Sequence, residues 1–584
     1  MMGVMTVLDR AVGDLVVPDR WGEGLLFGFS GVDGPTDVLS SFVATATARP
    51  FGLLFQHWTR RLLEIEVPDG GQVRIATGDV MGAEWADGTA LLVAFATCHS
   101  IVGLVPSGAD VTLRFESGRP TAQSGNAVVA EDSRWGDALA LCSVDSQFAL
   151  GYGRTVDEAT ALAERALQED PVEVARQRLR FLRRGPASPD KRHARLLAKC
   201  LSVMKVNTLG PEGQVARRWS TPDRVPHRDM WLWDSVFHSF AMNHVDPDLA
   251  WDFLAAVLES QRDDGMVPER AGPYGEPDPM TQPPLLAWAV ATNYRRGRDR
   301  DRLAWAFPRL ERASEWNLEH RDDNHNGLLE WLIEDDEQCR SGESGMDNSP
   351  RFDDALTLDA VDFSAYAALD MAHLAGIAAE LGEWSRAERW TDASRQMSGA
   401  IDRLLWDGRR SFYYDRNLTG DLSAVTAVSG LLPLLLSDLS PTRVDRLIEA
   451  LDDPALFKSK VPVPSVAVSA PYWSTDMWRG AAWVNTNFLI ICGLHQHGRE
   501  RAAQRLRAQT IEMVSTYYER YGVLFEFFDS SDERPPTECD RKGPRSGPYD
   551  VRGKYDAIRD LHWTAALTAC LILDELPDLA PLGS

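Results

Sequence analysis

The chain has 584 residues, which is too long for one ordinary hydrophobic core, so we expect two or more domains. Hydrophobic residues make up 44% and charged residues 25%, the balance of a soluble globular protein. The formal net charge is -25, and such a surface repels phosphate backbones and anionic lipid heads. The composition therefore argues against nucleic-acid and membrane partners and favours a neutral small molecule, although a local basic pocket could still hold an anion.

The N-terminal segment and the cysteines indicate the compartment. Residues 1–21 carry acidic side chains where a signal peptide would have its basic region and unbroken apolar run. No apolar stretch approaches the ~20 residues that span a bilayer. Seven cysteines at wide spacings fit neither a disulfide framework nor a CxxC metal pair. A reducing cytoplasm is therefore the expected compartment, with secretion by a route that lacks a recognisable signal as the alternative.

The first part of the chain predicts an antiparallel β-sandwich over residues 1–160. Short β-branched or aromatic runs alternate with Gly, Pro, Asp and Asn turns, as half-buried strands do. The clearest runs are RLLEIEVPDG, QVRIATGDV, ALLVAFAT, DVTLRFES and FALGYG. The pattern then becomes helical, and residues 161–189 are expected to form a helical linker to the next domain.

The rest of the chain, residues 190–584, is dominated by the helical period. Start signals such as Asp246-Pro247 and Ser440-Pro441 recur before apolar runs. About twelve helices are predicted, which fits an (α/α)6 barrel, although an irregular helical array would give a similar count. Their expected bounds are 190–207, 231–243, 247–261, 280–295, 299–318, 362–382, 385–406, 424–436, 441–451, 480–495, 498–518 and 559–574.

Long segments interrupt these helices and hold much of the Trp, Tyr, Asp, Glu and Gly. Loops of this composition usually carry function or cover a site. If the helices alternate in direction around a ring, alternate loops fall on one rim and could form a funnel. The segments are 262–281, 319–361, 407–422, 458–480 and 519–558.

Tryptophans near loop–helix junctions suggest a sugar ligand. The apolar face of a sugar ring stacks on an indole ring, and its hydroxyls bond to Asp, Arg, Gln or His. Each tryptophan alone is better explained as a large core residue, but the set favours carbohydrate. Its members are Trp231, Trp233, Trp331, Trp473, Trp478, Trp483 and Trp563.

Three segments offer polar side chains for such a ligand. In HRDMWLWDSVFHSF, Asp234 and His238 share one face of a helix, although Asp229 and Asp234 could equally be N-caps. In SGESGMDNSPRFDD, small neighbours leave Asp347 open to a ligand, while an Asx turn would explain the same residues. In YGVLFEFFDSSDERPP, Glu526 lies among phenylalanines, which disfavour its ionised form, or it is a strand residue that faces solvent.

Other chemistries find no support in the sequence. There is no GxSxG elbow, HExxH pair, Walker loop or GxGxxG turn after a strand. His227, His238 and His244 lack a cysteine or second histidine at ligand spacing. A catalytic metal is therefore not expected.

Six motifs in order resemble glycoside hydrolase family 63 over residues 190–580. They are MWLWDSVFH, QRDDGMVP, TQPPLLAWAV, ESGMDNSPR, YWSTDMWRGAAWVNTNFLI and FEFFDS. That family includes processing α-glucosidase and bacterial mannosylglycerate and glucosylglycerate hydrolases, and the related family 37 trehalases share ESGxD. The six motifs are specific for this clan and much less specific for the substrate.

The resemblance implies an (α/α)6 barrel that hydrolyses an α-glycosidic bond with inversion and that needs no cofactor. It makes Asp347 the general acid, with a raised pKa, and Glu526 the ionised general base. Their carboxyl groups should lie ~6.5–9.5 Å apart, with room for the attacking water. The sugar would contact residues of three of the motifs, namely Trp231, Trp233, Asp234, Gln282, Trp478, Arg479 and Trp483.

One departure from the family pattern follows Glu526, where the chain has a long charged segment, 529–558. Its basic residues could make it a lid over the pocket, a contact to a neighbouring subunit in a homo-oligomer, or only solvated surface. They are Arg541, Lys542, Arg545 and Arg552. This segment and the N-terminal β domain both weaken an assignment to the glycerate-specific enzymes.

The leading prediction is an α-glucosidase-like hydrolase for a small glycoside or short oligosaccharide. Trehalase, glucosylglycerate hydrolase and rhamnosidase-like activities remain open within that class. A non-catalytic carbohydrate-binding protein would not need both Asp347 and Glu526. A phosphorylase on the same barrel would put phosphate in place of the base.

Overall fold

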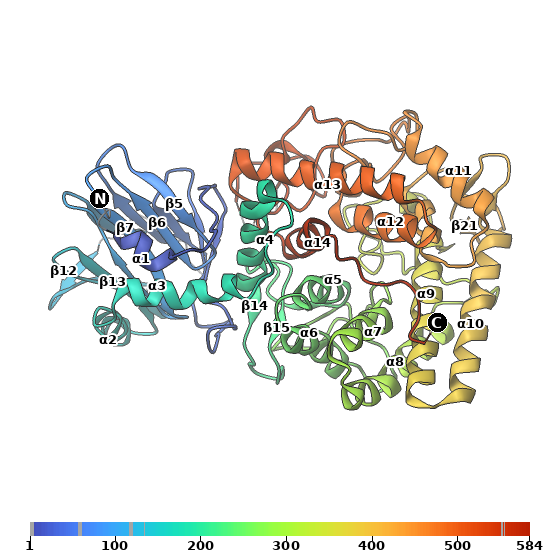
Figure 1. Cartoon of the computed structure of the whole chain (residues 1–584), viewed down its shortest axis with the longest axis horizontal. Coiled ribbons are helices and arrows are strands. Elements are labelled where there is room, and N and C mark those ends of the chain that lie inside the picture. Colours follow the sequence, from blue (N-terminus) through green and yellow to red (C-terminus); the bar gives the residue numbers. More distant parts are fainter. Residues whose placement is uncertain are drawn as a thin grey trace. The chain divides into compact units, whose positions relative to one another are not determined.

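The computed structural model describes residues 5–56, 61–115, 121–132, 135–550, 553 and 555–583 (Figure 1). The chain divides into two compact units, each of which is assembled from three segments of sequence. Unit 1 consists of Met1–Arg228, Ser515–Leu524 and Arg559–Ala565. Unit 2 consists of Asp229–Val514, Phe525–Ile558 and Ala566–Ser584. Arg552 of the charged segment lies outside the described residues.

Unit 1 contains two antiparallel sheets within its described residues. The strand order is β1-β2-β3-β4-β9 in one and β10-β11-β12-β13-β8-β7-β6-β5 in the other. The five predicted strands are confirmed as β4, β5, β7, β9 and β13. The bounds are β1 Leu26–Phe27, β2 Ala44–Ala46, β3 Gly52–Phe55, β4 Arg61–Glu66, β5 Gln72–Ala76, β6 Val80–Glu84, β7 Ala90–Thr97, β8 Ser100–Leu104, β9 Asp110–Phe115, β10 Ala122–Ser124, β11 Ala127–Asp132, β12 Asp137–Val144 and β13 Gln147–Gly153.

The two sheets share one hydrophobic core. Leu63 and Ile65 alternate along β4 toward that core, as the period of two requires. Leu91, Val93 and Phe95 of β7 face the same cluster from the other sheet. The other face of the eight-stranded sheet is covered by helices, because α2 (Val156–Ala166) packs on β12 and β13 and α3 (Pro171–Leu179) packs on β7. Helix α2 thus begins within the predicted β domain.

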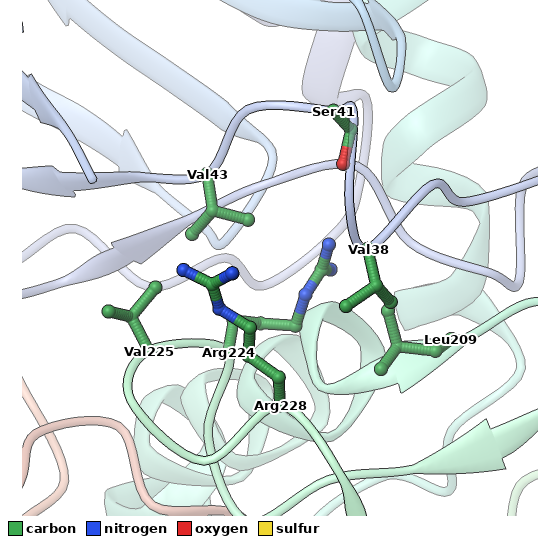
Figure 2. A pocket seen from close by; sticks show the side chains of 7 residues that line it. All are labelled: Val38, Ser41, Val43, Leu209, Arg224, Val225 and Arg228. Atoms are coloured by element: carbon green, nitrogen blue, oxygen red, sulfur yellow. The ribbon is translucent and has the colours of Figure 1, made fainter. Parts of the chain in front are cut away.

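A small cavity lies within unit 1, where Arg224 and Arg228 extend from one loop toward Ser41 and Val43 (Figure 2). Its volume is about 20 Å³, which is room for about one water molecule. Arg224 is buried and donates to the backbone oxygens of Phe29 and Val206, each at 2.9 Å. Burial lowers the pKa of Arg224 to about 10. The cavity is therefore a feature of the packing and is too small for a sugar.

Unit 2 is mainly helical, and its chain runs through α5–α8, then α9 and α10, then α11–α13 (Figure 1). Sequential helices pack on each other, as α5 does on α6 and α9 on α10. The first part of α13 and the last part of α14 belong to this unit. The helices are α5 Leu232–Met242, α6 Pro247–Glu259, α7 Leu286–Gly297, α8 Arg300–His320, α9 Val361–Leu381, α10 Trp384–Leu404, α11 Pro441–Asp452, α12 Val484–Gln496, α13 Glu500–Tyr521 and α14 His562–Leu573, and α4 Ala194–Val206 precedes them in unit 1.

Eleven of the twelve predicted helices are confirmed as α-helices among the described residues, and one prediction is wrong. Residues 424–436 form the 3-10 helix Val428–Leu435, with Pro433 inside it. Proline has no N–H for an α-helical hydrogen bond and its ring obstructs the preceding turn. The predicted helix at 280–295 begins only at Leu286, after Pro283 and Pro284. Within the described part of the chain, none of the helices has the length and apolar character needed to cross a membrane.

Candidate active site

Asp347 lies at the end of a tight turn that packs against Trp233. Gly345 has φ +66°, and a Cβ atom there would stand 2.3 Å from Cζ2 of Trp233. Only glycine fits both the left-handed backbone and this close approach. The backbone oxygen of Asp347 accepts from the N–H of Ser341 at 3.2 Å. The small residues of ESGMD therefore serve the geometry of the turn, and Gly345 packs this turn against the indole ring of Trp233.

Glu343 anchors the same turn from the inside. Its side chain is fully buried and pairs with Arg321 at 2.7 Å. It also accepts from the N–H of Thr281 at 3.2 Å and from the N–H of Leu332 at 2.9 Å. A buried carboxylate with a charged partner and two backbone donors is well compensated for its lost hydration. Glu343 thus fixes the Asp347 turn to the segment that contains Gln282.

Asn348 and Arg479 connect the Asp347 turn to the MWRGAAW motif. The Oδ1 of Asn348 accepts from the N–H of Trp478 at 3.1 Å, and its backbone oxygen accepts from Arg479 at 3.2 Å. Arg479 also forms a bidentate pair with Asp353, at 2.8 and 2.6 Å. Trp478 stacks face to face on Trp483, with ring centroids 3.9 Å apart. Arg479 therefore positions the turn, and its guanidinium is already engaged by protein groups.

Behind the turn, Arg351 is buried between two carboxylates. It bonds to Asp362 at 2.6 and 2.8 Å and to Asp415 at 2.7 and 2.9 Å. Asp362 also accepts from Nε1 of Trp331 at 3.0 Å, and Asp415 accepts from the N–H of Val361 at 3.0 Å. These bonds join the segment that follows Asp347 to the start of α9.

Glu526 is held by two hydrogen bonds to the backbone of Ile558 and by an arginine. Its N–H donates to the oxygen of Ile558 at 2.9 Å, and the N–H of Ile558 donates to its Oε2 at 3.2 Å. Arg541 forms a bidentate pair with its carboxylate, at 2.8 and 2.9 Å. Both side chains of this ion pair are buried, with 7% and 4% of their surface exposed. Glu526 is therefore not the solvent-facing strand residue that the sequence left open.

The next residue, Lys542, contacts the other carboxylate, since its Nζ lies 2.5 Å from Oδ2 of Asp347. Asp476 fixes the backbone here, because its two oxygens accept from the N–H groups of Lys542 at 2.7 Å and Gly543 at 2.8 Å. We call residues 540–543 the basic turn. Its two cations reach Asp347 and Glu526 from adjacent positions of the chain. Part of the charged segment is thus folded between the predicted acid and base.

The electrostatics of Asp347 differ from the prediction. Burial raises the pKa of its carboxyl group, but the ammonium of Lys542 more than offsets this effect, and the pKa is below its usual value of 3.8. The expected raised pKa is therefore wrong for this arrangement. The physical reason is an opposite charge at contact distance, which favours the ionised form.

The remaining predicted sugar contacts begin α5 and the segment before α7. The N–H of Trp233 donates to Oε1 of Gln282 at 3.4 Å. Trp231 is half-buried, with the guanidinium of Arg270 5.8 Å from its ring centroid. Asp234 is buried in the first turn of α5. A negative charge at this position is stabilised by the dipole of the helix. Trp231 occupies the N-cap position, so neither Asp229 nor Asp234 is the N-cap of this helix.

Glu269 is a site residue that sequence reasoning missed. It directly follows the QRDDGMVP motif and is 5% exposed. Its Oε1 accepts from Nε2 of Gln282 at 3.3 Å, and ionised Asp347 is one of the charges that raise its pKa. The signal in the sequence was its place in a long loop that also carries other motif residues. Nothing in the sequence showed that it would be buried.

The chain matches known glycoside hydrolases in sequence. The family described as the mannosylglycerate hydrolase MGH1-like glycoside hydrolase domain matches residues 226–540. A mannosylglycerate hydrolase of Thermus thermophilus is 25% identical over 57% of this chain and 94% of its own length. A glucosylglycerate hydrolase of Mycolicibacterium hassiacum is 28% identical over 38% of this chain and 51% of its own length.

Solved structures share the fold. The family 63 mannosylglycerate hydrolase of Thermus thermophilus in complex with glucose has a TM-score of 0.52 at 24% identity, over 64% of this chain and 99% of that one. A bacterial glucoamylase complexed with acarbose has a TM-score of 0.59 at 12% identity, over 97% and 98%. Because the family match covers more than half of the 584 residues, the chain belongs to the mannosylglycerate hydrolase MGH1-like glycoside hydrolases, of the family 63 type.

Proposed function

We propose that this glycoside hydrolase cleaves an α-glycosidic bond, with an α-glucoside as substrate, and inverts the anomeric configuration on an (α/α)6 barrel. The observation that carries the proposal is that two adjacent residues, Arg541 and Lys542, contact Glu526 and Asp347. Neighbouring Cα atoms are ~3.8 Å apart, so both carboxyl groups lie within reach of one dipeptide. Two carboxyl groups that share one site are what hydrolysis of a glycosidic bond requires, and inversion is the part of the proposal that the stereochemistry of the product tests.

The roles follow from the chemistry of inversion. Asp347 donates a proton to the glycosidic oxygen, and Glu526 accepts a proton from the water that attacks the opposite face of the sugar. Half-buried Trp231 supplies aromatic surface for the ring, and the fully buried Trp233, Trp478 and Trp483 support the site from within the core. Gln282 and Asp234 supply polar groups for its hydroxyls. The basic turn must release both carboxylates before either can act.

The stereochemistry of the first product tests the proposal. An α-glucoside incubated with the enzyme is expected to release β-glucose first, which a time-resolved proton NMR spectrum distinguishes from α-glucose before mutarotation. The spectrum should be recorded in phosphate-free buffer, so that an obligatory phosphorylase would give no product. Initial release of α-glucose would contradict inversion, and turnover that depends on added phosphate would favour a phosphorylase.

A second candidate is a glycoside with an anionic aglycone, of the kind named for the mannosylglycerate and glucosylglycerate hydrolases. The basic turn favours it, since Lys542 and Arg541 could exchange their carboxylate partners for a carboxylate of the substrate. One charge-assisted hydrogen bond contributes ~1.5–3 kcal/mol. In this case Lys542→Gln is expected to raise KM for glucosylglycerate at least about tenfold.

The matched substrate for this variant is glucosylglycerol, which lacks the carboxylate. Its KM should not rise in Lys542→Gln, because a neutral aglycone has no carboxylate for Lys542 to bind and no longer has to displace Lys542 from Asp347. An equal rise in KM for both substrates would show that Lys542 does not recognise the charge of the aglycone. The neutral α-glucoside would then remain the proposed substrate.

A further inference from the structure

The backbone of Glu269 is fixed in the long segment between α6 and α7. Its N–H donates to the oxygen of Met280 at 2.7 Å, and its own oxygen accepts from the N–H of Leu232 at 2.9 Å. Its Oε1 accepts from Gln282 at 3.3 Å. Among the described residues, its Oε2 is buried and has no hydrogen-bond partner. A buried carboxylate without a charged partner is costly, so a neutral carboxylic acid is the stable form here.

The loop of Glu269 is linked to the turn of Asp347 by two sets of contacts. Gln282 bridges Glu269 to the backbone of Trp233, whose ring packs against Gly345, two residues before Asp347. On the other flank, a Cβ atom at Gly342 would stand 3.6 Å from Cε of Met280, the hydrogen-bond partner of Glu269. The loop of Glu269 and the turn of Asp347 are thus packed together over several residues.

The charges around the three carboxyl groups are distributed unevenly. Asp347 pairs with Lys542 and Glu526 with Arg541. Among the described residues, no cation forms an ion pair with Glu269. The neighbouring Arg270 instead contacts Asp229 at 3.6 Å and Asp278 at 3.3 Å. Burial raises the pKa of Glu269 well above 4.5, and the charges of Asp347, Asp278 and Glu343 raise it further against the smaller effect of Arg270. Burial and the neighbouring negative charges therefore favour the protonated form of Glu269, whereas Lys542 favours the ionised form of Asp347.

We propose that Glu269 and Asp347 form a carboxyl pair that carries a single proton, held by Glu269 while Lys542 contacts Asp347 and by Asp347 once the substrate has displaced Lys542. Glu269 is thus a positioning residue that acts through Asp347. The inference rests on the proposed role of Asp347 as the general acid. It explains how an acid paired with a lysine can be protonated when it is needed.

The proton balance of the cycle is complete. Displacement of Lys542 moves the proton from Glu269 to Asp347, which then gives it to the glycosidic oxygen as the bond to the anomeric carbon breaks. Water adds to that carbon and its proton goes to Glu526. Glu526 returns this proton to solvent, and Glu269 takes one from solvent as Lys542 returns to Asp347. The net reaction consumes only water.

The test is the pH dependence of Glu269→Gln. In the wild-type enzyme the pair keeps its proton up to the raised pKa of Glu269, whereas in the variant only Asp347, with its lowered pKa, can hold one. The alkaline limb of kcat/KM for an alkyl α-glucoside is therefore expected to move to lower pH by at least about one unit, which is about tenfold in rate on the limb. The alkaline limb for α-glucosyl fluoride, whose leaving group needs little protonation, should not show this shift.

Asp370→Asn is the matched control, because Asp370 is also a buried carboxyl of unit 2 and burial raises its pKa to about 8. A carboxyl group whose pKa is higher in the folded than in the unfolded chain stabilises the fold at pH values below its pKa in the unfolded chain. This stabilisation is lost as the pH rises through its pKa in the folded chain. Both variants should therefore unfold at a higher temperature than the wild type at pH 9. Only Glu269→Gln should move the limb of kcat/KM.

An infrared difference spectrum locates the proton without turnover. At pH 7 the carbonyl band of a protonated carboxyl group should be present in the wild type and in Asp347→Asn, and should lose one component in Glu269→Gln. The carboxyl pair would be contradicted if the wild-type spectrum lacked this component. It would also be contradicted if Glu269→Gln left the alkaline limb of kcat/KM in place while Asp347→Asn was inactive. In both cases the proposed function would be unaffected. Full turnover by Asp347→Asn would instead overturn the proposed function.

Discussion

Asp347→Asn and Glu526→Gln are each expected to lower kcat for an alkyl α-glucoside at least ~10²-fold, the usual contribution of a general acid or base. Both changes keep the size of the side chain, but they remove its ability to exchange a proton and also the negative charge that pairs with Lys542 or Arg541. The reason for the loss differs between them, because the first variant cannot protonate the leaving group and the second cannot activate water. Steady-state rates and a thermal unfolding curve would be measured on the same samples.

The nature of the leaving group separates the two roles. α-Glucosyl fluoride departs with little proton assistance, so Asp347→Asn should recover most of its activity on this substrate, whereas Glu526→Gln should not. Near-normal turnover of the alkyl glucoside by either variant would remove that residue from its role. A large fall in the unfolding temperature would show instead that the loss reflects the fold.

Replacement of Arg351 by methionine is expected to cost at least ~3–5 kcal/mol of the free energy of unfolding. That is the usual loss when one partner of a buried ion pair is removed, and here two carboxylates, Asp362 and Asp415, are left without their cation. Because the whole fold of a domain is stable by only ~5–15 kcal/mol, the variant should be marginal. Urea unfolding monitored by tryptophan fluorescence measures the loss.

The control for Arg351→Met is Arg389→Ala, which breaks an ion pair with Glu315 of similar length, 2.8 Å, on the surface. Its two side chains are 55% and 43% exposed, so the loss should stay below ~1 kcal/mol. If Arg351→Met lost no more than this control, the buried cluster would not hold the Asp347 turn to α9. Activity would then survive as well.

The regular elements could be predicted from the sequence because their signals are local. Strand β4 alternates Leu63 and Ile65 toward the core, and α11 begins with Ser440 as its cap and Pro441 in its first turn. The segment around Pro433 was predicted wrongly because its apolar residues indicate a buried helix and do not distinguish an α-helix from a 3-10 helix. The structure has the buried 3-10 helix Val428–Leu435 there.

The candidate site was predicted only in part. Asp347, Glu526, Trp233 and Gln282 stood in motifs, but the motifs carry no information on which charge meets which carboxylate. The contacts of Lys542 and Arg541 join positions far apart in the chain, at 347 and 526. The state of Glu269 depends on its burial, which is a property of the assembled fold. Proton affinity in this site therefore follows from tertiary packing and could not be obtained from composition or spacing.

Unit 1 contains a carboxylate that ties together three distant parts of the chain. Asp560 accepts from the N–H groups of Leu26 at 3.0 Å and Leu524 at 3.1 Å, and it pairs with buried Lys199 at 2.9 Å. The module that begins at the N-terminus is thus completed by residues from near the C-terminus. Loss of the strand that contains Leu26 would take one hydrogen-bond donor from a buried carboxylate, so the stability of this sheet is coupled to a residue 534 positions further along the chain.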